Sequence, residues 1–275
     1  MGINDYPGTS SDLTGCVNDA NDWKEVLESR DFEVRLLLDR EATRKALAGE
    51  LRRLVGASRA GDILVFQFSG HGSWIPDEDG DEADSRDEVL CPHDIAGGGP
   101  LTDDDLHGIF SERRPGARVV LIADSCHSGT VSRFRRHAAG ERRGRRVRFL
   151  PPREFLSRAS LRALGKGERR RVASPPGRRS ALLLSGCLET EFSYDAVFRG
   201  RPNGAFTHAA IRSLARLPEG TTYLDWYAAI RRALPTAEYP QTPTLYGSST
   251  EKRWKVLEDT TIVKLDRVSC GARAQ

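Results

Sequence analysis

The chain has 275 residues, of which 38% are hydrophobic and 29% are charged, so it can bury one substantial core. No apolar run approaches the roughly 18 residues of a membrane span, and residues 1–4 show no signal-peptide core; we therefore expect a soluble cytoplasmic protein without membrane partners. The five cysteines are an odd number without C-x-x-C spacing, which argues against a disulfide framework. Cys91 and His93 form a C-x-H pair, but the suitably spaced ligands are too few for a zinc site.

The formal net charge of +3 conceals a strongly basic segment within an otherwise acidic chain. Residues 133–179 hold 17 Lys and Arg against 3 Asp and Glu, contain two Pro-Pro pairs and lack sustained apolar periodicity, which predicts a flexible, exposed linker. We expect this linker to join a large segment, residues 1–132, to a small segment, residues 180–275, of one domain. Arginine-rich segments often bind nucleic acid, but aromatic residues are sparse here, so nucleic acid is not the expected partner.

Alternating strand and helix patterns predict the fold. Residues 1–6 resemble the end of a first strand, and residues 14–29 are typical of a helix whose apolar face includes Trp23 and Leu27. Further elements are expected in this order: a strand at 33–39, a helix at 43–57, strands at 63–68, 119–122 and 180–187, helices at 204–217 and 223–234, and an edge strand at 254–263. This order predicts an α/β fold with a mostly parallel β-sheet flanked by helices on both faces.

Two of the predicted strands lead into residues with catalytic chemistry. One is followed by S-G-H-G, which contains His71, and the other by D-S-C-H-S-G, which contains Cys126. Because ligands and chemistry collect at the carboxyl ends of parallel strands, these side chains are expected to lie together. A nucleophilic cysteine needs a basic neighbour to lose its proton at neutral pH. Either residue alone could be an ordinary buried side chain, but the pair favours catalysis, with the amides of Gly72 and Cys126 as candidate oxyanion donors.

The motifs F-S-G-H-G and D-S-C-H-S-G, together with G-I-N-D-Y near the start and L-T-G-C-V-N-D-A at 13–20, resemble the caspase-like cysteine peptidases. The resemblance is to the metacaspase and orthocaspase branch, since the Q-A-C-x-G motif of animal caspases is missing. It implies a caspase-like α/β fold and peptide-bond hydrolysis by a dyad of Cys126 and His71.

Carboxylates near the candidate nucleophile predict the substrate's charge. Asp124 lies two residues before Cys126, so both face the same way on an extended strand, where a carboxylate favours a cationic substrate group. The resemblance implies that Cys16, Asp19 and Ser69 line the same pocket, which selects Arg or Lys before the cleaved bond. Arg is the better bidentate partner. Asp19 could instead be only a favourable acid in a first helical turn, and Asp124 could orient His71 or cap a loop.

Residues 186–195 occupy the position of a substrate-binding loop in caspase-like folds, with Asp195 and Tyr194 as candidate contacts. The expected partners are proteins or peptides with exposed Arg or Lys.

The basic linker is itself rich in the residue that the pocket is expected to select. Cleavage by the chain itself or by an upstream peptidase is therefore expected in the linker, which could occupy the acidic cleft as an inhibitor until it is cut. The candidate positions are Arg142, Arg143, Arg145, Arg146 and Arg148 in one cluster and Arg169, Arg170 and Arg171 in another.

Calcium is an open alternative, but no cofactor is expected to be required. Asp103 and Asp104 match aspartates that belong to an acidic cluster in calcium-activated metacaspases, whereas Arg133 stands near where those members tend to carry an acid. An acidic first helical turn after an N-capping Thr102 would also explain the two aspartates. A further alternative is a catalytically silent scaffold whose basic arm holds nucleic acid or an acidic partner. We expect a monomer, and the resemblance suggests a role in regulated cell death or defence.

Overall fold

A computed structural model of the chain describes residues 1–76, 86–126, 145–157 and 180–258. Its centre is a four-stranded sheet in the order β1-β5-β7-β10. The bounds are Ile63–Ser69 for β1, Arg118–Asp124 for β5, Leu182–Ser185 for β7 and Thr244–Tyr246 for β10. The first three strands are parallel and β10 is antiparallel to β7, so the predicted mostly parallel sheet is confirmed.

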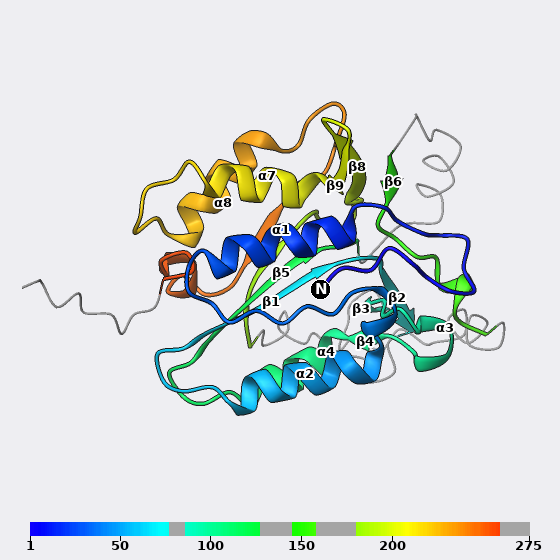
Figure 1. Cartoon of the computed structure of the whole chain (residues 1–275), viewed down its shortest axis with the longest axis horizontal. Helices are drawn as coiled ribbons and strands as arrows, with labels where there is room; N and C mark the ends of the chain where they lie inside the picture. The colour runs from blue at the N-terminus through cyan, green and yellow to red at the C-terminus, as the bar shows by residue number, and fades with distance from the viewer. Residues whose placement is uncertain (77–85, 127–144, 158–179, 259–275) are drawn as a thin grey trace, which may run out of the picture.

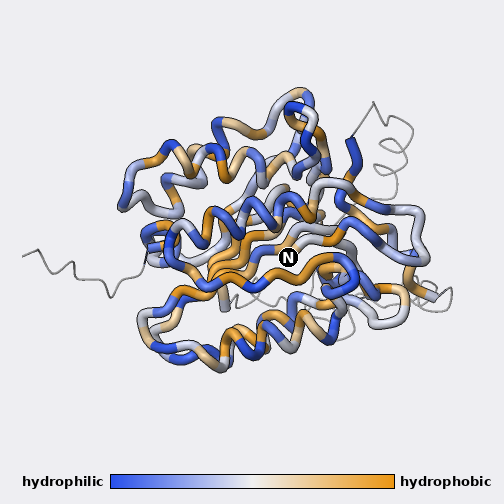
Figure 2. The backbone as a smooth tube through the Cα atoms, viewed as in Figure 1, coloured by the Kyte–Doolittle hydropathy of each residue, from blue (hydrophilic) through white to orange (hydrophobic). Residues whose placement is uncertain are grey.

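Helices cover both faces of this sheet, as predicted (Figure 1). One face carries α1 (Cys16–Glu28), α7 (Ala205–Leu214) and α8 (Tyr223–Ala233), and the other carries α2 (Arg44–Gly56) and α4 (Asp103–Ser111). The strands between these layers are the most hydrophobic part of the backbone (Figure 2), because a parallel sheet is buried on both faces.

Local capping explains where three of these helices begin. The Thr43 hydroxyl accepts a hydrogen bond from Ala46 N at the start of α2. Thr102 with Asp105 and Thr222 with Asp225 form reciprocal capping boxes at the starts of α4 and α8. Each cap satisfies amides that have no partner within the helix.

Two smaller antiparallel sheets were not foreseen from the sequence. One is β2-β3-β4 and the other is β6-β8-β9. Their strands are Gly72–Pro76 (β2), Arg86–Leu90 (β3), Leu101–Thr102 (β4), Arg146–Val147 (β6), Tyr194–Phe198 (β8) and Arg201–Gly204 (β9). Short helical turns complete the described elements: η1 (Asp39–Glu41), α3 (Ile95–Gly98), η2 (Pro152–Glu154) and η3 (Glu251–Arg253).

One predicted strand is wrong, and another is wrong over the part that the structure describes. Residues 33–39 form no strand, since only Leu38 makes an isolated bridge, to Gly2. The first residues of the chain lie against the carboxyl end of β1, where Gly2 also bridges Ser69. Gly2 is the one residue of this segment that pairs with Leu38, so no ladder forms there. Trp254 ends the η3 turn, and Lys255 makes only an isolated bridge to Thr222, so residues 254–258 contain no strand. The rest of that predicted strand, residues 259–263, lies outside the described residues.

The predicted exposed linker is also wrong for part of its length. Residues 145–157 are described, and within them Arg148, Phe149 and Leu150 are buried. Phe149 belongs to one of the two hydrophobic core clusters and Leu150 to the other. The basic composition of the linker gave no sign of this burial. The boundaries of the three predicted segments stay predictions. Among the described helices, none is both long and apolar enough to cross a bilayer.

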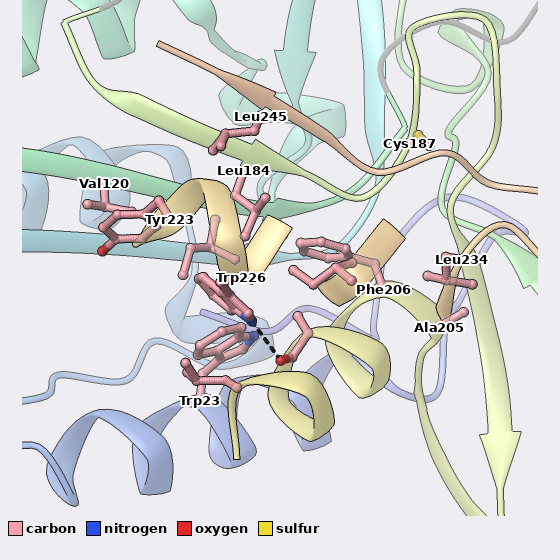
Figure 3. Close-up of a cluster of buried hydrophobic side chains, with 14 of the residues drawn as sticks. Trp23, Val120, Leu184, Cys187, Ala205, Phe206, Tyr223, Trp226, Leu234 and Leu245 are labelled. Carbon is pink, nitrogen blue, oxygen red and sulfur yellow. Dashed lines mark hydrogen bonds between the residues drawn. The ribbon is translucent and has the colours of Figure 1, made fainter. Parts of the chain in front are cut away.

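Aromatic side chains hold the α1, α7 and α8 layer together (Figure 3). Trp23 and Trp226 are both buried and meet edge to face with ring centroids 6.0 Å apart. The Trp226 Nε1 group donates to the Ala210 carbonyl at 3.0 Å, so its one polar atom is satisfied inside the core.

We expect Trp226→Ala to lower the free energy of unfolding by about 3–5 kcal/mol, because it leaves a cavity and removes this hydrogen bond. Urea denaturation measures the change. Leu224 on the same helix is 47% exposed, so Leu224→Ala is the control and should change the free energy of unfolding by no more than about 0.5 kcal/mol. Equal effects of the two substitutions would contradict the packing described.

Candidate active site

The register of the central sheet brings the two predicted motifs together. In the parallel pair β1 and β5, Ser69 lies opposite Asp124, so His71 and Cys126 each follow two residues beyond the paired positions. A single carbonyl then joins the two strand ends: Arg148 O accepts hydrogen bonds from Gly72 N at 3.0 Å and from Cys126 N at 3.1 Å. These are the two amides expected to hold an oxyanion.

His71 is oriented by the N-terminal loop. Its backbone amide donates to the Tyr6 hydroxyl at 2.7 Å, and its Nε2 atom lies against the Ser11 carbonyl. Since a carbonyl only accepts, Nε2 carries the ring proton and Nδ1 is the basic nitrogen. Nδ1 is buried and has no hydrogen-bond partner in the described part of the chain. Burial lowers the pKa of His71 to about 4, against the opposing effect of the Ser11 carbonyl, so the imidazole is neutral at pH 7.

The Cys126 sulfur lies against the loop that precedes β8. Ser193 N donates to this sulfur at 2.6 Å, and the Ser193 carbonyl lies 3.4 Å from it. An amide donor at this position stabilises negative charge on the sulfur. Cys187 is a neighbouring thiol, and its hydrogen bond with Cys126, together with burial, raises the pKa of Cys187 well above its ordinary value. All four cysteines within the described ranges are free.

Arg148 fills a pocket built from three carboxylates, which we call the acidic pocket: Asp19, Asp124 and Asp195. Its Nη2 atom lies 2.6 Å from Asp19 Oδ2 and 3.0 Å from Asp195 Oδ1, and its Nη1 atom lies 3.1 Å from Asp124 Oδ2. All four side chains are buried. A guanidinium with donors in a fixed fork suits several carboxylates at once.

Helix N-termini and polar side chains hold these carboxylates in place. Asp195 accepts from the amides of Thr14 and Gly15, where α1 begins. At the start of α7, Asp19 accepts from Gly204 N at 2.9 Å, and Asp124 accepts from Thr207 N at 3.0 Å. The positive end of each helix favours a negative charge, so the carboxylates have partners besides the guanidinium.

Burial and charge act in opposite directions on the ionisation of the acidic pocket. Burial raises the pKa of Asp19 to about 6, although Arg148 and the hydrogen bond from Gly204 act against it. Burial alone would lower the pKa of Arg148, but the negative groups around it, led by Asp124, raise that pKa well above its ordinary value. The guanidinium therefore stays charged, and Asp19 is mostly ionised at pH 7.

The other residues predicted to bind substrate differ in whether they contact this pocket. Asp195 enters it directly, whereas Tyr194 pairs through its backbone with Val147. Cys16 is buried in the core, where burial raises the pKa of its thiol well above the ordinary value, so the thiol is neutral at pH 7 and adds no charge to the pocket. The Ser69 hydroxyl accepts a hydrogen bond from Gln67 Nε2 at 2.8 Å, and its role in lining the pocket stays a prediction.

Asp103 and Asp104 lie in the first turn of α4, after the capping residue Thr102. Within the described ranges, no group of three or more His, Cys, Asp or Glu side chains is arranged to hold a metal ion. Calcium binding stays a prediction. Arg142, Arg143 and Arg169–Arg171 lie outside the described residues.

Several residues of the site were missed by sequence reasoning. They are the Ser11 carbonyl and the side chains of Ser193, Asn203, Thr207 and Gln241, which hydrogen-bond to His71 or around the carboxylates. The N-G pair at 203–204 was a usable signal. A Cβ on Gly204 would lie 2.1 Å from Asp124 Oδ2 and 2.6 Å from Arg148 Nη1, so the pocket requires glycine there.

Comparison with known proteins gives consistent matches. The family profile described as the caspase domain matches residues 1–254. Metacaspase-1 of Cryptococcus neoformans is 30% identical over 286 residues, which cover 90% of this chain and 61% of that protein. The chain therefore spans less than two thirds of that relative's length.

Solved structures agree with the sequence match. A protein of Geobacter sulfurreducens is 27% identical with a TM-score of 0.70, over 94% of this chain and 96% of that one. Caspase-1 of Spodoptera frugiperda, at 13% identity and a TM-score of 0.56 over 89% and 83% of the two chains, has the same fold. The expected caspase-like fold and the resemblance to metacaspases are thereby confirmed.

We expect Gly204→Ala to destabilise the folded chain by about 1–3 kcal/mol or more, because the added methyl group overlaps the acidic pocket. Denaturant unfolding checks this. Gly49 in α2 has nothing within 4 Å of an added Cβ, so Gly49→Ala is the matched control and should stabilise the chain by up to about 1 kcal/mol. If Gly204→Ala proved as harmless as the control, the close approach at the pocket would be refuted.

Proposed function

Because the chain belongs to the caspase-domain family, we propose that it is a cysteine endopeptidase that cleaves peptide bonds after arginine. One observation carries the proposal. The Arg148 side chain lies among Asp19, Asp124 and Asp195 while its own carbonyl oxygen lies between the amides of Gly72 and Cys126. A peptide bond in that position has its side chain recognised and its carbonyl polarised at once.

His71 and Cys126 supply the nucleophile and the base. Neutral His71 accepts the thiol proton at Nδ1, because its Nε2 proton is engaged by the Ser11 carbonyl. The Cys126 sulfur then attacks the substrate carbonyl carbon, and His71 returns the proton to the leaving amine. The Ser193 amide, 2.6 Å from the sulfur, offsets charge on the nucleophile.

The amides of Gly72 and Cys126 hold the oxygen of the tetrahedral intermediate. Both already lie about 3 Å from a carbonyl oxygen, at 3.0 and 3.1 Å. Donors fixed in advance at this position need no reorganisation as the negative charge grows, which is the main requirement of an oxyanion site.

The charge of the acidic pocket sets the substrate preference. Arginine engages all three carboxylates through two nitrogen atoms. A lysine ammonium is a compact point charge without the planar fork, so it matches this arrangement less well. An aspartate would add a fourth negative charge to a buried site, which excludes it.

The other parts of the proposal rest on the sequence and on the family resemblance. The chain is a cytoplasmic monomer made as a zymogen, and processing in the linker by the chain itself or by an upstream peptidase activates it. Its substrates are proteins with exposed Arg or Lys, in regulated cell death or defence. Activation by calcium is a prediction that only measurement with and without the ion will decide.

We expect a peptide with Arg before the cleaved bond to be hydrolysed about tenfold more efficiently than its Lys counterpart, and the Asp counterpart not at all. Fluorogenic peptides measure this, with and without calcium, before and after limited proteolysis of the chain. Cys126→Ala should lower kcat/KM by at least about 1000-fold. Cys187→Ala removes the neighbouring thiol and should retain most of the activity.

Turnover of none of the three peptides under any of these conditions would sink the proposal and favour the silent scaffold. Preference for Asp would refute the assignment of the acidic pocket alone.

A further inference from the structure

Residues 145–150, which we call the cleft segment, cross the site as a two-residue strand, β6, followed by a bend at Arg148. Its strand β6 pairs antiparallel with β8, with Arg146 opposite Asp195 and Val147 opposite Tyr194, and the two strands lie side by side in Figure 1. The ladder continues where Arg148 N donates to the Ser193 carbonyl at 2.9 Å. Addition of a strand to an existing sheet edge is a common way of binding an extended peptide.

Only one bond of the cleft segment is presented for attack. The Arg148 carbonyl oxygen accepts hydrogen bonds from both oxyanion donors, Gly72 N and Cys126 N, so the Arg148–Phe149 bond is the one whose carbonyl is polarised next to the nucleophile.

The other two arginines of the cleft segment are held elsewhere. Arg146 is exposed and its Nη1 atom lies against the Asp12 carbonyl. The Arg145 guanidinium lies 6.0 Å from the ring centroids of both Tyr194 and Tyr239, a cation–π arrangement outside the acidic pocket. Arg148 is therefore the arginine of the cleft segment that the acidic pocket binds.

The residues after this bond are anchored in the body of the domain. Phe149 is buried, with its ring centroid 6.0 Å from that of Phe192. Leu150 N donates to the Gly72 carbonyl at 3.0 Å, and the Ser73 hydroxyl donates to the Leu150 carbonyl at 2.6 Å. These contacts hold the scissile bond in register and do not depend on the bond being intact.

We propose that the Arg148–Phe149 bond is the chain's own first substrate and is cut within the same molecule. This inference rests on the proposed function. The Cys126 sulfur forms a thioester with the Arg148 carbonyl carbon as the C–N bond breaks, and the Phe149 nitrogen leaves as an amine with the proton that His71 carried. One water molecule then hydrolyses the thioester, which gives the Arg148 carboxylate and restores the thiol. Other substrates gain access to the acidic pocket only when Arg148 leaves it.

Mass spectrometry of the purified full chain, sampled over time, tests this. The expected products are fragments 1–148 and 149–275. The first-order rate constant for their formation should not change over a 100-fold range of protein concentration. Cys126→Ala should remain intact. Arg148→Gln should slow the cut by at least about 100-fold and Arg148→Lys by about tenfold, whereas Arg146→Gln, at the exposed neighbour, should leave its position and rate nearly unchanged.

The outcomes separate this inference from the proposed function. A new N-terminus at Phe149 in the wild-type chain supports the inference even if Arg148→Gln fails to fold. A cut only after Arg142, Arg143 or Arg169–Arg171, or an uncut chain that still hydrolyses arginyl peptides, would overturn the inference and leave the proposed function standing. A first-order rate constant that rises with protein concentration would show cleavage between molecules and overturn cleavage within one molecule. An uncut chain without peptide turnover would overturn both.

Discussion

Three buried carboxylates need positive charge and hydrogen-bond donors around them, and the rest of the site supplies both. Asp19 comes from α1, Asp124 from the end of β5 and Asp195 from β8, and their charges would repel one another and cost desolvation energy if they were left alone. The start of α7 contributes amides to Asp19 and Asp124, but the full compensation needs a cation. Arg148 supplies it from the chain itself.

Arg148 also positions the loops that carry the candidate catalytic residues, because its backbone bridges the two loops while its side chain binds the carboxylates. The Arg148 carbonyl accepts hydrogen bonds from amides that follow β1 and β5, and the Arg148 amide donates to the Ser193 carbonyl. The Ser193 amide in turn donates to the Cys126 sulfur. Side-chain recognition and carbonyl placement are thus coupled through one residue. Under the proposed function, a substrate with a different side chain would lose the alignment of its carbonyl as well as the ion pairs, so binding energy would be used for catalysis.

The sequence predicted the central part of this arrangement because its signals are local. Apolar runs at β1 and β5 indicated buried parallel strands, and parallel pairing fixes where His71 and Cys126 meet. Asp124 followed from the two-residue period of a strand. What could not be predicted depends on chain segments distant in sequence: the Ser11 carbonyl that sets the His71 tautomer, the two small sheets, and the burial of Arg148. Arginine-rich composition pointed to an exposed linker, whereas three specific carboxylates and the buried Phe149 and Leu150 overrule composition at this one place.

The most direct measurement of the central claim is the stability of Arg148→Met against pH, in a Cys126→Ala background that cannot be cut. Burial raises the pKa of Asp19 to about 6 even beside the guanidinium, so its removal leaves this carboxyl still more readily protonated in the folded state. Protonation then supplies stability at low pH that is lost as the pH rises through the folded-state pKa. We predict a loss of about 3–5 kcal/mol relative to the parent at pH 8, the cost of leaving buried charges unpaired, and a clearly smaller loss at pH 5. Equal losses at the two pH values, or none at pH 8, would contradict the account.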